Sequence, residues 1–356
     1  MRSKSVLLRR LSVALLACAA LWAAPSGAAR FENLYTVIVP PDPAATNQRR
    51  AAIQAAMAQL LIRVTGSREA PFDPMLQPLI QSAEGMETAY GTDRRGAFVE
   101  FNGSRVERAL AELGARFWGP ERPLTLLWVA VDDGAGGRAL LGADGTTDLG
   151  AAATPQMTEL LTTVREELMK AADERGLPIA WPLLDLEDLS RVSFIDVWGK
   201  FEDRIVAASA RYRADAVLIG SVRPGVFGIE VEWLLVNGIE RQNLPSTAVR
   251  DGLDVAADRF AAELGTIGGA SLTLLTVRNV STPRDYGRVL SYLERQSVLE
   301  TVDVESFGDG MLRLRVAARG DAGVLERVFA LGGVLQPAFG GLGSLTFELV
   351  EDNSLQ

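Results

Sequence analysis

The sequence contains no histidine, and its one cysteine, Cys18, lies close to the N-terminus. Without histidine, a serine or cysteine nucleophile has no imidazole base, and haem and ordinary zinc sites lose their commonest ligand. A single cysteine also excludes an internal disulfide and a cysteine-rich zinc site. The chemistries that remain use carboxylate pairs, lysine-assisted serine, or Mg²⁺ or Ca²⁺ held by oxygen ligands.

Short motifs for phosphate binding, nucleophilic catalysis and calcium binding are missing as well. The chain has no G-x-S-x-G, no G-x-x-x-x-G-K-[ST] and no twelve-residue calcium loop. The stretch VDDGAGG has the residue types of a calcium loop without its spacing, so it predicts a tight turn after a strand. We therefore predict no cofactor.

Positive charge is in short supply. The chain carries 36 lysine and arginine residues against 45 aspartate and glutamate residues, for a formal net charge of −9. An acidic surface repels phosphate backbones, and no basic stripe interrupts it, so a nucleic-acid partner is not expected. An apolar content of 48% with 23% charged residues is typical of a packed globular protein, and this length indicates two or three domains.

The N-terminus has the composition of a secretory signal peptide. Four basic residues in MRSKSVLLRR precede the apolar run LSVALLACAALWAA, which is too short to span a membrane and is followed by Pro25 and small residues. Cleavage is expected after Ala28 or Ala29; removing residues 1–28 changes the net charge to −9 − 4 = −13. The alternative is a lipoprotein signal, in which LLAC is the lipid box and Cys18 carries the anchor. No later apolar run is long enough for a membrane helix, so we expect a periplasmic protein.

Residues 30–118 are predicted to form a small α+β domain. LYTVIV predicts a strand that ends at two prolines, and the following segment places apolar side chains on one face of a helix that ends at Gly66. A second strand is predicted for AFVEF. The next helix is expected to begin with a capping box between Ser104 and Glu107.

Residues 120–264 are predicted to form an α/β domain with a mixed sheet. The apolar run 124–131 predicts a buried strand, and a Gly- and Ala-rich loop over 134–153 leads to a helix that begins at Thr154 and Pro155. PIAWPLL and ADAVLIGSV are predicted strands with a helix between them. This order is β-α-β-α-β, as in sheets with parallel strands.

The same domain is predicted to end with an antiparallel hairpin and a helix. FGIEVEWLLVNG alternates apolar and polar residues, and Asn237 and Gly238 are typical of a two-residue turn. A closing helix is expected over 253–264. The stretch GTIGGA then has the composition of a linker.

Residues 271–356 are predicted to form a ferredoxin-like domain. The pattern gives a strand in SLTLLTV, a helix starting at Thr282 and Pro283, two strands joined across a Gly-Asp-Gly turn, a second helix, and a last strand in SLTFELV. The order is β-α-β-β-α-β. We expect this domain to fold on its own, and its fold alone names no function.

Four long stretches of the chain resemble one bacterial family. They are YTVIVP with LLIRVTGSRE, RPLTLLWVAVDDG, the stretch from GLPIAWPLLDLEDLSRV to ADAVLIGSV, and DYGRVLSYLERQSVLETVDV. Together they resemble the family called domain of unknown function 2066, over nearly the whole mature chain. The resemblance implies a Gram-negative envelope protein, and it carries no assigned activity or site residue.

The stretch WPLLDLEDLS holds the candidate site residues Asp185, Glu187 and Asp188. They follow a predicted strand, where open α/β sheets bind ligands. An ion or ligand site needs their oxygens to converge, and acid–base catalysis needs two carboxyl groups in different environments. The alternative is a polar turn that caps the next helix, worth about 0.5 to 2 kcal/mol for each cap. The turn is favoured because an extended segment would point Asp188 away from the other two.

The sequence as a whole favours a non-catalytic periplasmic protein that binds another envelope component. The rival hypothesis is an ion- or small-molecule-binding protein, or a carboxylate-based enzyme, that uses the acidic stretch; a third is a small-molecule sensor in the C-terminal domain. The sequence names neither the partner nor the oligomeric state.

Overall fold

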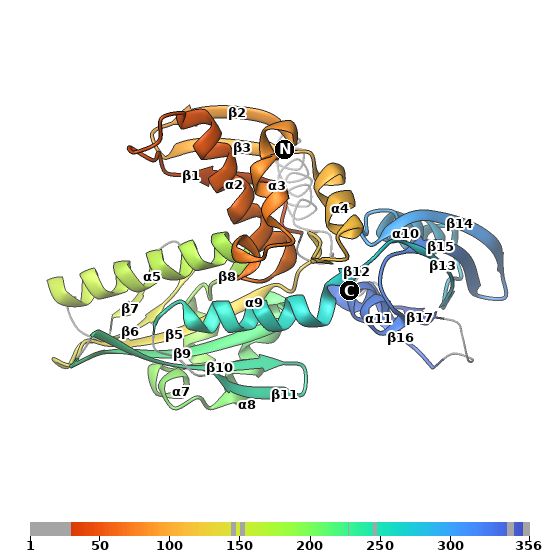
Figure 1. Cartoon of the computed structure of the whole chain (residues 1–356). Coiled ribbons are helices and arrows are strands. Elements are labelled where there is room, and N and C mark those ends of the chain that lie inside the picture. The colour runs from red at the N-terminus through yellow and green to blue at the C-terminus, as the bar shows by residue number, and fades with distance from the viewer. Residues whose placement is uncertain are drawn as a thin grey trace, which may run out of the picture.

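The structure is a computed structural model that describes residues 30–143, 147–149, 154–226, 228–244, 248–339 and 345–351. These residues form three units, each with its own mixed or antiparallel sheet (Figure 1). The predicted multidomain α/β and α+β class is confirmed. The expected signal peptide and the alternative lipid site at Cys18 lie outside the described residues.

The first unit packs helices on one face of a three-stranded antiparallel sheet of order β1-β3-β2. The long helix begins where the Asn47 side chain accepts a hydrogen bond from the Arg50 backbone N–H, and it ends as predicted at Gly66, in the left-handed conformation. The elements of the first unit are β1 (Thr36–Val39), α2 (Gln48–Thr65), η1 (Ala70–Phe72), α3 (Gln77–Gln81), η2 (Ala83–Gly85), β2 (Glu87–Asp93), β3 (Gly96–Phe101), α4 (Gly103–Glu112) and the short β4 (Arg116–Phe117).

Two features of this unit differ from the sequence prediction. The strand β2 was not predicted, because its polar residues and Gly91 hide the alternation. The predicted capping box between Ser104 and Glu107 is wrong. Asn102, in an extended conformation, caps α4, and its side chain accepts a hydrogen bond from the Arg105 backbone N–H. Glu107 instead binds Tyr35 and Arg319, which reaches it from the C-terminal unit at 2.9 Å.

The middle unit is a three-layer α/β/α arrangement around a sheet of order β11-β10-β9-β5-β6-β7, with β8 beside β5. The central strands β5 and β9 are parallel, and the outer strands are antiparallel. Helices α5 and α9 cover one face, and α6 to α8 cover the other (Figure 1). Its elements are β5 (Thr125–Asp132), β6 (Arg138–Leu141), β7 (Thr147–Leu149), α5 (Pro155–Arg175), β8 (Ile179–Ala180), α6 (Leu186–Arg191), α7 (Phe194–Trp198), α8 (Glu202–Ser209), η4 (Ala210–Tyr212), β9 (Ala216–Gly225), β10 (Gly228–Asn237), β11 (Glu240–Leu244) and α9 (Asp251–Leu264).

Three predictions for this unit need correction. The expected loop over 134–153 contains β6 and β7, since VDDGAGG is the turn of a hairpin that adds two strands to the sheet. PIAWPLL contributes only the two residues of β8, because Pro182 follows closely. The β10–β11 turn consists of Gly238 and Ile239, one residue later than predicted, because Asn237 pairs with Glu240.

The C-terminal unit has a five-stranded sheet of order β14-β15-β13-β17-β16. Its elements are β13 (Ser271–Arg278), α10 (Pro283–Leu293), β14 (Leu299–Gly308), β15 (Met311–Ala318), α11 (Ala322–Ala330), η5 (Leu331–Gly333), β16 (Leu335–Pro337) and β17 (Leu345–Leu349). The predicted pattern of elements holds as far as α11. The edge strand β16 is additional, and it reverses the chain so that β17 runs parallel to β13, whereas a plain β-α-β-β-α-β order would make these two strands antiparallel.

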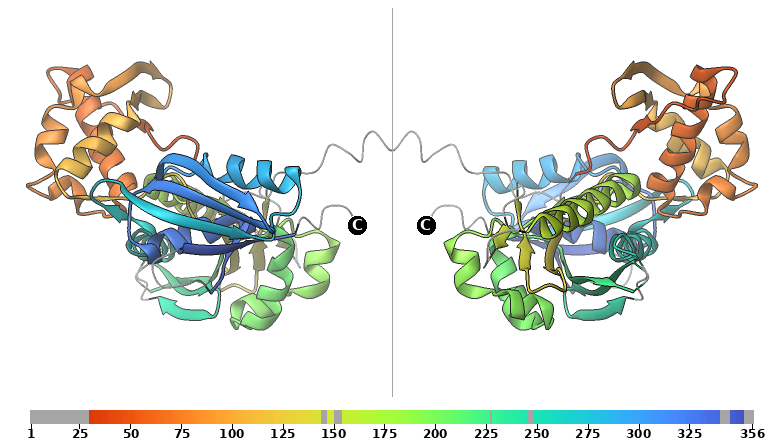
Figure 2. Two further views of the ribbon diagram at one scale, coloured as in Figure 1. Left: turned by 90° about the vertical axis from the view of Figure 1, so that its right-hand side faces the viewer. Right: turned by 90° about the vertical axis from the view of Figure 1, so that its left-hand side faces the viewer.

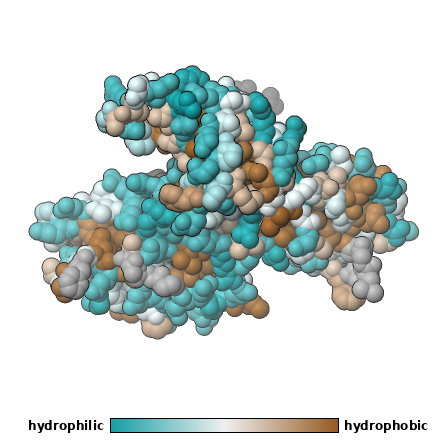
Figure 3. Space-filling view, in the orientation of Figure 1, coloured by the Kyte–Doolittle hydropathy of each residue, from teal (hydrophilic) through white to brown (hydrophobic). Residues whose placement is uncertain are grey.

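The outer face of this sheet is not covered by a described helix. The left view of Figure 2 looks onto its strands. Leu275 and Val277 of the central strand β13 point into the core, whereas Leu272, on the opposite face, is 72% exposed. In the orientation of Figure 1, the surface of the first unit is mostly hydrophilic, and hydrophobic residues are more frequent over the C-terminal unit (Figure 3).

Buried arginines join the first and middle units. Arg122 is fully buried, stacks 3.9 Å from the Trp118 ring centroid, and donates five hydrogen bonds of 2.7 to 3.0 Å to backbone carbonyls. Three of these carbonyls lie at helix ends: Arg63 in α2, and Arg175 and Gly176 at the end of α5. Burial lowers the pKa of Arg122 to about 9, so the guanidinium stays protonated at neutral pH and opposes the negative ends of two helix dipoles.

The middle and C-terminal units are joined by a shared core. Helix α9 packs against α11, and one continuous cluster of buried apolar residues runs through both units. The predicted linker is also held in place, because Thr266 and Ile267 form β12, which pairs with β4 of the first unit. The three units therefore contact one another around the ends of α2, α5 and α9.

Candidate functional site

The acidic stretch forms the first turn of its own short helix, α6, which was not predicted from the sequence. Asp185 is the N-cap residue, and its carboxylate accepts from the Asp188 backbone N–H at 3.0 Å. Glu187 and Asp188 follow in the first turn, where negative charge stabilises the helix dipole. The capping role that the sequence favoured for this stretch is confirmed for Asp185.

Arg211 holds the three carboxylates together. Its two terminal nitrogens donate to the two oxygens of Asp185, each at 2.8 Å, and Nη1 also reaches Asp188 Oδ1 at 3.1 Å. Glu187 lies 3.5 Å from the same nitrogen and pairs with Arg191 at 3.1 Å. The hydrogen bonds from Arg211, and next that from the Asp188 N–H, lower the pKa of Asp185 well below its usual range.

Asp188 lies in a different environment from its two neighbours. It is 1% exposed, and its Oδ2 accepts from the Leu184 backbone N–H at 2.9 Å and from the Tyr212 hydroxyl. Burial, and then this hydrogen bond to Asp188, raise the pKa of Tyr212 to about 12. The expectation that Asp188 points away from the other two acids is wrong, because the segment is a helical turn, in which Asp188 accepts from the Leu184 backbone N–H and shares Arg211 with Asp185.

This arrangement connects α6 to the end of the α8 segment through charge-assisted hydrogen bonds. The carboxylate oxygens of Asp185 and Asp188 already accept from Arg211, Tyr212 and backbone N–H groups. Within the described ranges, no group of acidic, histidine or cysteine side chains is arranged to hold a metal ion. The geometry is that of a structural cluster, and its use as a ligand site stays a hypothesis.

The same helical layer exposes several large apolar side chains. Leu186 and Leu189 are three residues apart on α6, so they lie on one side of it, and Leu183 precedes the helix; Leu186 is 87% exposed and Leu183 is 50% exposed. Ile195 on α7 is 63% exposed, and Phe201 stands at the start of α8 beside a hollow of about 450 Å³. These five residues are called the α6–α8 surface.

Unusual backbone conformations concentrate in this layer. Of the five residues other than glycine that have positive φ angles in the described part of the chain, three are Leu184, Lys200 and Arg213, with φ of 52°, 55° and 50°. Such conformations cost free energy for leucine, lysine and arginine and are frequent at functional sites. The Lys200 ammonium is fixed by Glu232 at 2.7 Å and Ser221 at 3.3 Å. These conformations could not be predicted from the sequence, because glycine, asparagine and aspartate, the residues that usually adopt them, are absent from the three positions.

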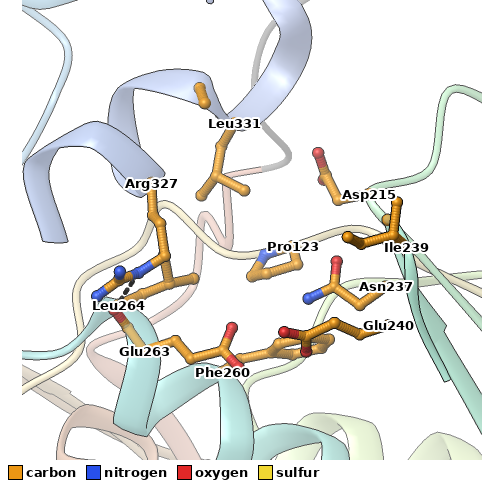
Figure 4. Close-up of a pocket in the computed structure, with 12 residues that line it drawn as sticks. Pro123, Asp215, Asn237, Ile239, Glu240, Phe260, Glu263, Leu264, Arg327 and Leu331 are labelled. Carbon is orange, nitrogen blue, oxygen red and sulfur yellow. Dashed lines mark hydrogen bonds between the residues drawn. The ribbon is translucent and has the colours of Figure 1, made fainter. Parts of the chain in front are cut away.

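A larger cleft of about 580 Å³ lies between the middle and C-terminal units, where α9 and α11 meet the β10–β11 turn (Figure 4). Phe260 and Leu264 of α9 and Leu331 after α11 line it with apolar atoms. Asp215, Glu240, Glu263 and Arg327 supply its charged groups. We call it the α9–α11 cleft. Sequence reasoning missed it because its residues come from five distant segments, none with a motif.

Comparison with known families gives one match. Residues 28–119 match the model of a family described as Domain of unknown function (DUF8605). This supports an uncharacterised domain of unknown function in the first unit, although it is not the family numbered 2066 that the sequence resembles. No curated protein and no solved structure matches the chain.

The described helices were also compared with the requirements of a membrane span. None of them combines the length and the apolar character that crossing a membrane requires. The longest, α5, has 21 residues and carries charged side chains along its length.

Proposed function

We propose that the protein is a non-catalytic interaction protein of the cell envelope, and that a protein partner docks on the α6–α8 surface. The observation that carries the proposal is the exposure of five large apolar side chains within residues 183–201. Exposed apolar side chains are usually scattered singly, and a concentration of them favours a protein interface. The strained backbone at Leu184 and Lys200 presents these short helices in a fixed orientation.

The expected partner has an apolar centre and a basic rim. Residues 183–204 contain six acidic and three basic side chains, a formal charge of −6 + 3 = −3. Asp185 and Glu187 are each more than two-fifths exposed at the edge of the surface. A partner with lysine or arginine around its apolar contact would complement this rim and would bind more weakly at high salt.

The proposed location is the periplasm, which the signal-peptide composition of residues 1–28 supports. The resemblance to family 2066 supports the same compartment. A ferredoxin-like origin of the C-terminal unit belongs to the proposal too, since the order β14-β15-β13-β17 fits that pattern apart from the direction of β17.

A binding comparison with matched variants tests this function. Wild type, a Leu186→Asp/Ile195→Asp double variant and a Met169→Asp control are tagged and used to capture proteins from envelope extracts at low and high salt. Met169 lies on α5, on the opposite side of the sheet, and is also exposed, so the control makes the same chemical change elsewhere. The substituted side chains are all exposed, so all three proteins should fold.

We expect one stoichiometric partner that the wild type and the Met169→Asp control retain and the double variant loses, with weaker capture at high salt. If the double variant retained the partner, the interface would lie elsewhere on the protein. Capture of nothing by the wild type, or loss of its only partner on removal of a metal ion, would contradict a protein-docking role. Self-association that the double variant abolishes, measured by sedimentation, would identify a second copy as the occupant instead of another envelope protein.

A further inference from the structure

We propose that the α9–α11 cleft binds a small organic cation with an apolar body, independently of any partner on the α6–α8 surface. The cleft volume of about 580 Å³ falls within the range of roughly 300 to 1,000 Å³ found for small-molecule sites. It lies between two units, where such sites are frequent. Its walls come from α9, α11 and the β10–β11 turn (Figure 4).

The apolar floor selects the body of the ligand. The Phe260 ring is 1% exposed and therefore held rigidly in the core of α9, with Leu264 one turn further along the helix. Leu331 contributes from the opposite wall. Since Phe260 and Leu264 expose almost no surface to solvent, the apolar area that a ligand can cover comes mainly from Leu331 and from Ile239, which is 96% exposed, and a planar or branched group of a few carbon atoms fits against them.

The charged groups select the sign of the ligand. Three carboxylates and one guanidinium line the cleft, and Arg259 pairs with two of the carboxylates from outside the lining, so the local formal charge is −3 + 2 = −1. The guanidinium of Arg327 is turned to the Glu263 backbone carbonyl, to which it donates at 2.9 Å (Figure 4). A cation is therefore attracted and an anion repelled.

Glu240 and Glu263 are the groups that would bind the cation. One oxygen of each pairs with Arg259, which lies outside the lining and holds both carboxylates at the same end of the cleft. The second oxygen of each has no hydrogen-bond donor among the described residues. An ammonium or amidinium group in the cleft could donate to these oxygens, and such charge-assisted bonds are about twice as strong as neutral ones.

Ile239 gives a separate indication of a ligand. It occupies the second position of the β10–β11 turn and is 96% exposed, although polar residues and glycine are favoured there. It stands at the rim of the cleft, where it can cover an apolar ligand. An apolar residue such as Ile239 in a predicted turn is the sequence feature that would have indicated a ligand site.

Benzamidine and benzamide form a matched pair of probes, because they share a shape and differ in charge. We expect benzamidine to bind the wild type, measured by calorimetry, at least roughly tenfold more tightly than benzamide. A Glu240→Gln/Glu263→Gln double variant should reduce the benzamidine affinity to that of benzamide. The control Glu230→Gln removes an exposed carboxylate at the other end of β10 and should leave the affinity unchanged.

A second variant separates binding from folding. Ile239→Ser changes only an exposed side chain, so the protein should fold normally and bind both probes several-fold more weakly, with the ratio between them kept. Equal binding of benzamidine and benzamide to the wild type, no binding of either, or unchanged benzamidine affinity in the double glutamine variant would each overturn the proposal. If Glu230→Gln lost as much benzamidine affinity as the double variant, the overall charge of the protein would explain the loss. That result would overturn the proposal as well.

Discussion

At the scale of single residues, burial separates the three carboxylates of the acidic stretch. Asp188 accepts hydrogen bonds from Leu184, Arg211 and Tyr212 in a site closed to solvent, whereas Asp185 and Glu187 lie at the surface. The sequence shows three similar acids within four residues and cannot show which of them turns inward. That depends on Tyr212 and Arg211, more than twenty residues later.

The first prediction concerns Asp188→Asn. An amide keeps one accepting oxygen and replaces the other with an NH₂ group, so at least one of the donors from Leu184, Tyr212 and Arg211 loses its acceptor, and we expect a loss of about 1.5 to 3 kcal/mol in the free energy of unfolding. Urea unfolding measures it. Glu187→Gln, at an exposed position, should stay within about 0.5 kcal/mol of wild type. Equal losses in the two variants would contradict the burial of Asp188, and a rise in stability with millimolar Mg²⁺ or Ca²⁺ in the wild type alone would favour an ion site.

The second prediction concerns pH and Asp185. Because Arg211 lowers the pKa of Asp185 in the folded state below its ordinary value of 3.8, the carboxylate contributes stability that is fully present above that value and is lost as the pH falls below it. Unfolding by urea between pH 6 and pH 2 should therefore show a difference between wild type and Asp185→Asn that shrinks below about pH 4. Arg211→Met should remove the same pH dependence. A difference that is constant over this range would exclude the Arg211 contact as its cause.

At the scale of elements, helices with strong end signals could be predicted. Thr154 and Pro155 begin α5, and Thr282 and Pro283 begin α10, as the sequence indicated; in the structure Gly176 ends α5 and a capping box starts α10. Short elements that depend on neighbours could not be predicted. Strand β6 pairs with β5 and β7 pairs with β6, and Arg211 binds the first turn of α6, so these short elements depend on contacts with other parts of the chain.

Two glycines at helix ends provide the third prediction. Gly66 and Gly114 both have positive φ, 70° and 63°, but an added Cβ would lie 2.0 Å from the Ala261 Cβ at Gly66 and would meet nothing within 4 Å at Gly114. We expect Gly114→Ala to cost about 1 to 2 kcal/mol for the backbone alone, and Gly66→Ala to cost about 1 to 3 kcal/mol more. Urea midpoints compare the two variants. Equal losses would mean that α9 can move away from α2 without cost.

At the scale of the whole molecule, contacts between units rest on residues that no local pattern identifies. Arg122 directly precedes a predicted strand, yet its guanidinium donates hydrogen bonds to backbone carbonyls at the ends of α2 and α5. Arg319, Glu107 and Tyr35 likewise join the C-terminal and first units. The multidomain α/β and α+β class could be predicted because successive stretches of the chain have their own hydrophobic periodicity. Their arrangement could not be predicted because it depends on pairs far apart in sequence.

The fourth prediction is that Arg122→Lys destabilises the joint between the first and middle units. A lysine has three donors without the planar fork, so several buried carbonyls lose their partners, and we expect a loss of about 3 kcal/mol or more. Limited proteolysis should then cleave faster near residue 120. Arg108→Lys, at an exposed position on α4, serves as the control and should change neither property. Wild-type stability in Arg122→Lys would show that water can replace the five hydrogen bonds.

The fifth prediction concerns the C-terminal unit in isolation. Residues 271–356 should fold cooperatively as a fragment, because the sheet, α10 and α11 bury their own apolar residues. The fragment should melt at a lower temperature than the intact chain and bind more of a hydrophobic dye, since it exposes the side of α11 that packs against α9. Amide dispersion of a random coil would show that the shared core is essential for folding, and equal melting temperatures would show that it contributes nothing.

The carbonyls that accept from Arg122 also determine when the chain can finish folding. The guanidinium lies 59 residues after the α2 carbonyl of Arg63 and 53 residues before that of Arg175. A chain that is made from its N-terminus therefore cannot complete the hydrogen bonds at the end of α2 until Arg122 has followed, and Arg122 in turn lacks two of its acceptors until the end of α5 has been made. The joint between the first and middle units should therefore form only after the end of α5 has been made, and its completion depends on one side chain, Arg122.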